Sequence, residues 1–274
     1  MTASRAYVAS PHIDTTVPHS ARVWDYWLGG KDNYEVDRVL GDAYRDVFPG
    51  IVDIARAQRL FLCRAVRFLA GEMGVRQFLD IGTGLPALDN THEVAQQIAP
   101  DARVVYVDND PLVLAHGRAL LTSTLEGATD FIEADVCAPG DIVEQAAVTL
   151  LDLRRPVAVL MLGILGHIGD GEAHRIVRQA MAPLVPGSYL AVCDGVITSA
   201  ARAQAHDAYN KSGAAPYILR TSDQIGGFLD GLEFVDPGEH GPGMVAPHLW
   251  RPELPSIRPV IDVEARAGVG RKVR

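Results

Sequence analysis

Cysteine is scarce in this sequence of 274 residues, which contains only Cys63, Cys137 and Cys193. Their odd number, their wide separation and the lack of a CxxC pair argue against a disulfide framework or a cysteine-based metal site. We expect reduced thiols in the core of a cytoplasmic protein. The sequence also lacks any run close to the roughly 18 apolar residues that a membrane span requires, and its first residues show no signal-peptide pattern. A membrane is therefore not expected as a partner.

Positive charge is in short supply as well, because 25 Lys and Arg residues stand against 34 Asp and Glu residues, for a formal net charge of −9. Proteins that bind the phosphates of nucleic acids usually carry a basic surface. Nucleic acid is therefore not expected as a partner. The segment HEVAQ at residues 92–96 nearly matches the HExxH zinc motif but lacks its second histidine, so we expect no metal.

The order of the remaining elements predicts an α/β protein. Three helices are expected before residue 74, the first ending at Gly29 and Gly30 and the second beginning after Asp32 or Asn33. Later in the chain, short apolar runs alternate with helix-like segments, which predicts parallel βαβ units in a doubly wound sheet with ligands at the carboxyl ends of its strands. The runs are QFLDI, RVVYVD, TDFIEAD, PVAVLML and SYLAVCD, and the helix-like segments are 91–98, 111–122, 139–151 and 170–184.

The last part of the chain predicts a different arrangement. TSDQIGGFLDG has the pattern of a capped helix, LEFVDPG that of a strand and MVAPHLWRP that of a final strand, with no helix between the two strands. We expect them to form an antiparallel hairpin at the edge of a mostly parallel sheet. The whole chain is therefore expected to consist of a helical extension or cap, residues 1–74, and a Rossmann-like domain, residues 75–274.

The segment LDIGTGLPALDN, residues 79–90, places a glycine turn between a strand and a helix. Gly82, Thr83 and Gly84 allow the backbone to approach a ligand closely, and the helix N-terminus that follows offers unpaired N–H groups. Asp80, in the strand before the turn, is a further candidate for binding the cofactor. The turn also satisfies the dinucleotide pattern G-x-G-x-x-G/A, so by itself it permits NAD(P) as a ligand.

Acidic residues end the next two strands. Asp108, followed by Asn109, lies 24 residues after Gly84 (108 − 84), where a carboxylate can accept both hydroxyls of a ribose. Asp135 can accept a hydrogen bond from an adenine amine, with the backbone N–H of Val136 as a second contact. One such acid could simply cap a helix, but three at consecutive strand ends favour a ligand. A glycine turn, a ribose acid and an adenine acid form the S-adenosylmethionine (SAM) pocket of Rossmann-like methyltransferases.

Several segments together resemble the actinobacterial SAM-dependent methyltransferase family long catalogued as a domain of unknown function. The resemblance covers about residue 20 to residue 252, and the GGKDN turn at residues 29–33 is its most specific mark. It implies the class I methyltransferase fold and SAM as cofactor, and it does not identify the methyl acceptor. Many methyltransferases have a third glycine where this chain has Leu85, Pro86 and Ala87, so we expect a longer and stiffer loop. The segments are ARVWDYWLGGKDNYEVDR, FLDIGTGLPALDNTHEVAQ, VVYVDNDPLVLAHGRALL and RTSDQIGGFLDGLEFVDPG.

His167, in the segment LGILGHIGD after the fourth strand, is a candidate general base for an acceptor that must lose a proton. A role as a mere lining residue of the pocket is an equally open interpretation. We expect transfer of the sulfonium methyl to a small-molecule acceptor by in-line displacement. Two alternatives stay open, a non-catalytic SAM-binding protein and an NAD(P)-linked oxidoreductase, although the chain has no Tyr-x-x-x-Lys pair. The sequence does not fix the oligomeric state.

The GGKDN turn raises a further question, because ordering two adjacent glycines costs backbone entropy. A helix end followed by a helix start accounts for Gly30 and for Asp32 or Asn33, but not for Lys31. The methionine carboxylate of SAM needs a cation, since the strand-end acids would repel it. We therefore expect residues 20–48 to cover the cofactor pocket, with Lys31 near this carboxylate.

Overall fold

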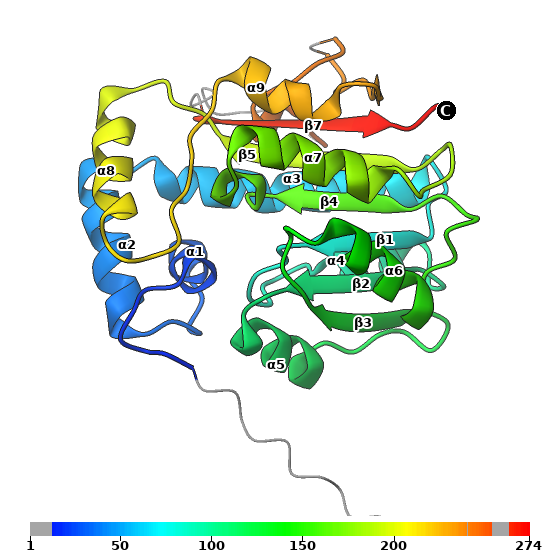
Figure 1. Ribbon diagram of the computed structural model, residues 1–274, viewed down its shortest axis with the longest axis horizontal. Coiled ribbons are helices and arrows are strands. Elements are labelled where there is room, and N and C mark those ends of the chain that lie inside the picture. Colours follow the sequence, from blue (N-terminus) through cyan, green and yellow to red (C-terminus); the bar gives the residue numbers. More distant parts are fainter. Residues whose placement is uncertain (1–12, 240, 254–262) are drawn as a thin grey trace, which may run out of the picture.

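The computed structural model describes residues 13–239, 241–253 and 263–274, which form a seven-stranded sheet in the order β3-β2-β1-β4-β5-β7-β6 with helices on both faces (Figure 1). Strands β1 to β5 are parallel, and β7 runs antiparallel to both of its neighbours. The predicted doubly wound, mostly parallel sheet with an antiparallel C-terminal edge is confirmed. The strands are β1 Gln77–Ile81, β2 Arg103–Asp108, β3 Ala128–Glu133, β4 Ala158–Leu162, β5 Tyr189–Gly195, β6 Glu233–Phe234 and β7 Ala265–Arg271.

Both faces of the sheet are covered, which explains why the central strands are continuous apolar runs and not alternating ones. All residues of β1 and β5 are buried. One face packs against α6 and α7, and the other packs against α3 and α4, with α5 beside β2 and β3. These helices are α3 Ile51–Gly71, α4 Thr91–Ile98, α5 Pro111–Leu120, α6 Pro139–Thr149 and α7 Asp170–Met181.

Three further helices, α1 Ser20–Leu28, α2 Glu35–Val47 and α8 Ala200–Asn210, stand beyond the carboxyl ends of the parallel strands (Figure 1). They share a separate hydrophobic cluster with the start of α3, to which Trp27, Tyr44 and Tyr209 contribute. Because α3 also packs under the sheet, it connects this cluster to the sheet. The division of the chain at residue 74 stays a prediction. Helix α8 was not expected from the sequence.

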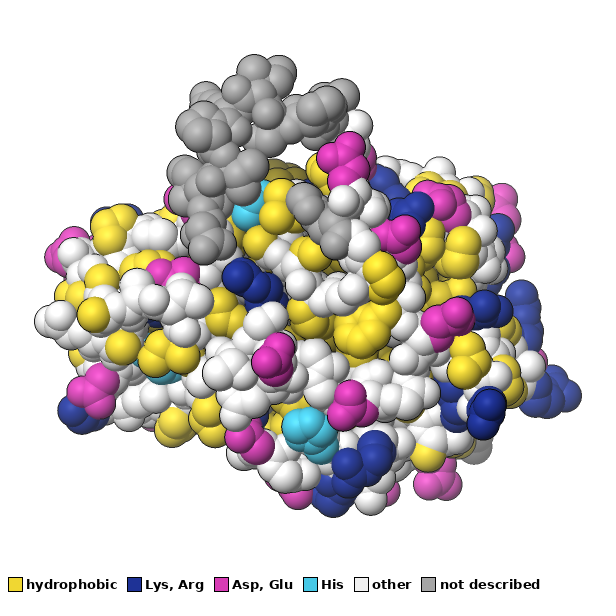
Figure 2. All heavy atoms as spheres, turned by 90° about the horizontal axis from the view of Figure 1, so that it is seen from above, with side chains coloured by type: hydrophobic (Ala, Val, Ile, Leu, Met, Phe, Trp, Pro, Cys, Tyr) yellow, Lys and Arg dark blue, Asp and Glu magenta, His cyan; other side chains and the backbone are white. Residues whose placement is uncertain are grey.

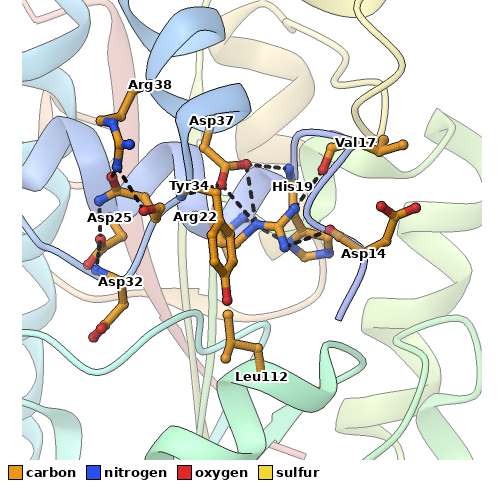
Figure 3. Close-up of polar contacts among 12 residues, drawn as sticks. Asp14, Val17, His19, Arg22, Asp25, Asp32, Tyr34, Asp37, Arg38 and Leu112 are labelled. Atoms are coloured by element: carbon orange, nitrogen blue, oxygen red, sulfur yellow. Dashed lines mark hydrogen bonds and ion pairs between the residues drawn. The ribbon is translucent and has the colours of Figure 1, made fainter. Parts of the chain in front are cut away.

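A buried ion pair joins α1 to α2. Arg22 Nε lies 3.1 Å from Asp37 Oδ2, and both side chains are almost fully buried. The Asp37 carboxylate also accepts the backbone N–H groups of His19 and Tyr34, each at 2.9 Å, while Arg22 donates to the carbonyl of Val17 (Figure 3). Removal of one partner would leave an unpaired buried charge, so this pair fixes the two helices against each other.

The GGKDN turn between α1 and α2 is organised by Asp25. Its carboxylate accepts the backbone N–H of Asp32 at 3.0 Å and the side-chain amide of Asn33 at 2.8 Å. Gly29 ends α1 in the left-handed conformation, with φ of 85°. A Cβ on Gly30 would overlap the Asp25 carboxylate, so glycine at this position is required by a close approach.

The start of α2 differs from the expectation. Its N-cap is Tyr34, whose backbone N–H is bound by Asp37, and the prediction of Asp32 or Asn33 as the cap is wrong. The side-chain amide of Asn33 is directed to Asp25 and to the carbonyl of Gly30 instead. The polar residues of the turn therefore hold it together internally.

The predicted final strand over MVAPHLWRP is also wrong. This segment forms one β-bridge, from Val245 to Ala267, and the short helix η3 Pro247–Leu249. Trp250 is fully buried against α3, where it meets Phe61 edge-on. The strand that pairs with β5 is β7, whose sequence ARAGVGR contains two glycines. Glycine is depleted in strands, which hid β7; here a Cβ on Gly270 would come within 2.9 Å of a neighbouring leucine.

Other elements complete the described chain. The helix predicted at TSDQIGGFLDG is confirmed as α9 Ser222–Gly226 followed by the short helix η2 Gly227–Leu229. Within the described ranges, no helix combines the length and apolar character that crossing a membrane requires. The same residues contain no group of three or more His, Cys, Asp or Glu side chains suited to hold a metal ion.

Candidate functional site

A cavity of about 410 Å³ lies between the carboxyl ends of β1 to β5 and the helices α1, α2, α3 and α8. Its lining includes residues at or just after the carboxyl ends of all five parallel strands. In a doubly wound sheet this edge is where ligands bind, because the strand order reverses there and opens a crevice. The reversal occurs between β1 and β4.

The glycine turn forms part of the cavity wall. Gly82 and Gly84 adopt φ values of 73° and 67°, and Thr83 lies between them on the same wall. A Cβ on Gly82 would come within 2.7 Å of Ile164, whereas the space around Gly84 is open. Helix α4 begins only at Thr91. Packing therefore requires the first glycine, and the second leaves room for a ligand beside the backbone.

Two buried carboxylates support this turn. Asp108 Oδ2 accepts the backbone N–H of Gly84 at 2.9 Å, and its Oδ1 accepts that of Asp110 at 3.0 Å. Asp80 accepts the hydroxyl of Thr91 at 2.6 Å. Burial raises the pKa of both carboxyl groups, that of Asp80 to about 6. Each oxygen of Asp108 keeps a lone pair, so this residue can hold the turn and still accept from a ligand.

The residues after β3 reach the same cavity from the side. Asp135 is exposed, and its Oδ1 accepts the backbone N–H of Cys137 at 2.8 Å. Val136 is buried, and Asn109 is exposed next to the β2 end. Asn109, Asp135, Val136 and Cys137 all line the cavity. The expectation of a buried thiol at Cys137 is wrong, because this cysteine lies at the exposed loop before α6; Cys63 and Cys193 are buried.

Lys31 is not brought to the cavity. Its side chain is exposed, does not line the wall and makes no hydrogen bond or ion pair within the described ranges. A different cation, Arg59 of α3, lines the cavity and contacts Leu88, in the loop between the glycine turn and α4. It donates to the carbonyl of Leu88 at 2.9 and 2.8 Å, and its charge lowers the pKa of Asp80 against the larger effect of burial. Sequence reasoning missed Arg59, since one arginine on a helix gives no signal.

His167 lies in η1 Leu165–His167, which follows β4, and it lines the cavity. Its Nδ1 is 2.8 Å from the carbonyl oxygen of Pro216. Because a carbonyl can only accept, Nδ1 carries the proton, and Nε2 of the neutral ring has a free lone pair. Burial lowers the pKa of His167, which favours the neutral ring at pH 7. The imidazole is therefore able to accept a proton at Nε2.

Aromatic side chains surround the same end of the cavity. Tyr217 donates its hydroxyl to Asp194 at 2.5 Å, and its ring meets His167 edge-on. His206 Nε2 lies 2.6 Å from the Tyr217 carbonyl, and its Nδ1 lies 3.4 Å from the Tyr44 hydroxyl. Tyr44 comes from α2, His206 from α8 and Tyr217 from the loop after α8. Sequence reasoning missed the latter two elements, because the segment after β5 has no strong periodicity.

Comparisons with known proteins agree with one another. A family model described as S-adenosyl methyltransferase matches residues 6–273. A DUF574 family protein from Streptomyces avermitilis MA-4680 is 42% identical, with a TM-score of 0.86, over 95% of this chain and 100% of that one. A methyltransferase candidate from Thermobifida fusca YX is 40% identical, with a TM-score of 0.86, over 95% and 97% of the two chains. No curated protein matches.

Proposed function

The chain belongs to the S-adenosyl methyltransferase family, and from this premise we propose that it transfers the SAM methyl group to a small organic acceptor. The observation that carries the proposal is that two groups of residues line opposite ends of the same cavity. The glycine turn, the acids Asp80 in β1 and Asp108 at the end of β2, and Asp135 after β3 line one end, and His167 with aromatic side chains lines the other. The family membership supports neither an NAD(P)-linked activity nor a non-catalytic role.

The residues at the β1 to β3 end suit the nucleoside part of SAM. The open space beside Gly84 admits a ligand against the backbone, next to Gly82 and Thr83. The free lone pairs of Asp108 suit the ribose hydroxyls, with Asn109 adjacent. We assign the adenine amine to Asp135 with the Val136 backbone, and the support of the turn to Asp80. When bound, SAM supplies an electrophilic methyl group on a sulfonium.

The methionine carboxylate needs a cation in this cavity. Sequence reasoning pointed to Lys31, but Arg59 is the residue that lines the cavity, bound to the loop after the glycine turn. Its hydrogen bonds go to a neutral carbonyl, so its charge is not neutralised by them. We therefore propose Arg59 as the partner of this carboxylate.

At the opposite end, His167 is proposed as the general base. The Pro216 carbonyl fixes the proton on Nδ1, so Nε2 is the nitrogen that takes the proton lost by a hydroxyl or amine acceptor. The aromatic wall would exclude water and orient a flat or apolar acceptor. Much of the rate enhancement in such a displacement comes from positioning the two reactants. The buried ion pair between α1 and α2 contributes to this because it fixes two helices that line the cavity.

We also propose that the protein is actinobacterial and works in the cytoplasm. The two similar solved proteins come from Streptomyces and Thermobifida, and the three cysteines are unpaired, as in a reducing compartment. Acidic and basic side chains are interspersed on the face shown in Figure 2. Together with the negative net charge, this supports a small molecule and not nucleic acid as the partner.

The proposal is tested by calorimetric titration of the protein with SAM, S-adenosylhomocysteine and NAD. We expect binding of the first two and none of the third. Binding of NAD without SAM would contradict the proposal. Asp135→Ala refines the test, because it should weaken SAM more than an analogue with inosine in place of adenosine. Equal losses for both ligands would remove Asp135 from the adenine site.

A further inference from the structure

Arg202 of α8 is buried at the aromatic end of the cavity, and within the described ranges it forms no ion pair. Only 3% of it is exposed, and it lines the cavity wall. Its Nε and Nη1 are buried and have no hydrogen-bond partner among the described residues, and no ion pair joins it to a carboxylate there. A buried guanidinium normally has its donors paired. The unpaired donors therefore indicate a missing anionic partner.

The surroundings hold this guanidinium in place. It lies 5.7 Å from the ring centre of Phe48, a cation–π contact that supports its position without neutralising its charge. A Cβ on Gly195 would overlap Nη2, so the glycine at the end of β5 makes room for it. Asp194, which precedes Gly195, accepts the Tyr217 hydroxyl through Oδ1, its Oδ2 has no partner among the described residues, and burial raises its pKa to about 6. The fold thus positions Arg202 beside the Tyr44 hydroxyl and leaves Nε and Nη1 without a partner among the described residues.

Arg202 lies beside the end of β5, which is distant from the nucleoside end of the cavity. Arg202 follows β5, whereas Asp108 ends β2, and the order β2-β1-β4-β5 places three strand spacings between these ends. At about 4.8 Å per spacing this corresponds to roughly 14 Å. The side chains around Arg202 include Tyr44 and His206, and burial lowers the pKa of both His206 and His167. Arg202 therefore supplies positive charge at the acceptor end.

We infer that the methyl acceptor is an organic acid with an apolar or aromatic body, whose carboxylate pairs with Arg202. The inference rests on the proposed function and narrows its substrate class. Arginine suits this task because its donors match the planar geometry of a carboxylate. The aromatic walls contributed by Trp27, Tyr44 and Tyr209 would hold the body of the acid. The alternative partner, the carboxylate of SAM itself, is an outcome of the test.

The first experiment measures the thermal stability of the ligand-free protein. Arg202→Met removes the unpaired charge and keeps an unbranched side chain, so its melting temperature should equal or exceed that of the wild type. Arg56→Met removes an exposed arginine of α3 and serves as the matched control. A clear loss of stability in Arg202→Met alone would show that Arg202 serves the fold, and would overturn the inference.

The second experiment titrates benzoate and its neutral analogue benzamide into the protein loaded with S-adenosylhomocysteine. Benzoate should bind at least tenfold more tightly than benzamide to the wild type and to Arg56→Met, and this preference should disappear in Arg202→Met. Equal binding of the two probes, or binding of neither, would overturn the inference.

A third measurement separates the two carboxylates and the two proposals. Arg202→Met should leave the affinities for SAM and methylthioadenosine unchanged. A loss for SAM alone would assign Arg202 to the carboxylate of the cofactor and overturn the inference. If the wild type binds SAM but not benzoate, only the acid acceptor fails; if it does not bind SAM, the proposed function fails.

Discussion

Arg59 and Lys31 show how strongly the surroundings of a basic residue decide its use. Both carry the charge that a carboxylate needs, but only Arg59 lines the cavity, while Lys31 is exposed at a turn. The turn around Lys31 is held by Asp25 and requires no ligand. The sequence predicts a cation for the methionine carboxylate at Lys31, and the structure places Arg59 in the cavity wall instead.

Arg59→Met should weaken SAM by about 2 kcal/mol, the typical contribution of a charged hydrogen bond, and should barely affect methylthioadenosine, which lacks the carboxylate. Lys31→Ala should change neither affinity. Calorimetry measures the affinities of both variants for SAM and for methylthioadenosine. Equal losses for the two ligands in Arg59→Met would show only a loosened glycine turn, and a loss of SAM in Lys31→Ala would restore the original assignment.

The carboxyl group of Asp80 gives a pH-dependent signal. Burial raises its pKa from 3.8 to about 6, so the folded protein holds this proton more tightly than the unfolded chain. The resulting stabilisation is complete below pH 3.8 and is lost as the pH rises through 6. At pH 7.5 Asp80→Asn should therefore exceed the wild type in unfolding free energy by about 3 kcal/mol, at roughly 1.4 kcal/mol per pH unit.

At pH 4 the difference should shrink to about 0.5 kcal/mol, because Asp80 is then protonated in the folded protein and partly protonated in the unfolded chain. Denaturant unfolding at both pH values measures the difference, and the effect of Asp194, whose pKa is also about 6, cancels. A difference that does not change with pH would show that the Asp80 carboxyl is not perturbed in the folded state.

Among the elements, the joint between α1 and α2 shows that adjacent glycines can have different reasons to be glycine. Gly29 adopts a positive φ and has open space around it, whereas Gly30 touches the Asp25 carboxylate. The first requirement concerns the backbone alone. The second concerns packing against a buried charge, which is the costlier of the two to disturb.

Gly30→Ala should therefore destabilise the protein by about 2 kcal/mol or more, because displacing Asp25 leaves buried polar groups unpaired. Gly29→Ala should cost only about 1 kcal/mol, the penalty for a left-handed alanine. Denaturant unfolding of the two variants gives the comparison. Equal losses would mean that Asp25 does not organise the turn.

For the whole molecule, the cavity is built from both the sheet and the N-terminal helices. Because α1 lines it with Trp24 and Trp27, S-adenosylhomocysteine should slow amide exchange in α1 and α2 as well as at the glycine turn. Hydrogen–deuterium exchange read by mass spectrometry tests this. Protection confined to residues 80–136 would show that these helices do not cover the cofactor, and α9 serves as the unaffected reference.

The sequence predicts which segments form the parallel strands and which polar residues end them, because apolar runs closed by Gly82, Asp108 or Asp135 are local signals. It does not reveal β7, since its glycines are tolerated only where neighbouring side chains cover them. It also does not reveal Arg59 or Arg202. Their meaning depends on the approach of α3 and α8 to the strand ends, which is a tertiary fact with no local signature.

The placement of β7 has a consequence for synthesis of the chain. Residues 265–271 pair with the whole length of β5, from Tyr189 to Gly195, so β5 has a bare edge until some 70 further residues have been translated. At roughly 5–20 residues per second this takes several seconds. During that time an apolar strand edge is open to pairing with other nascent chains. Chaperone supply and translation speed, more than the stability of the finished fold, should therefore govern the yield of soluble protein.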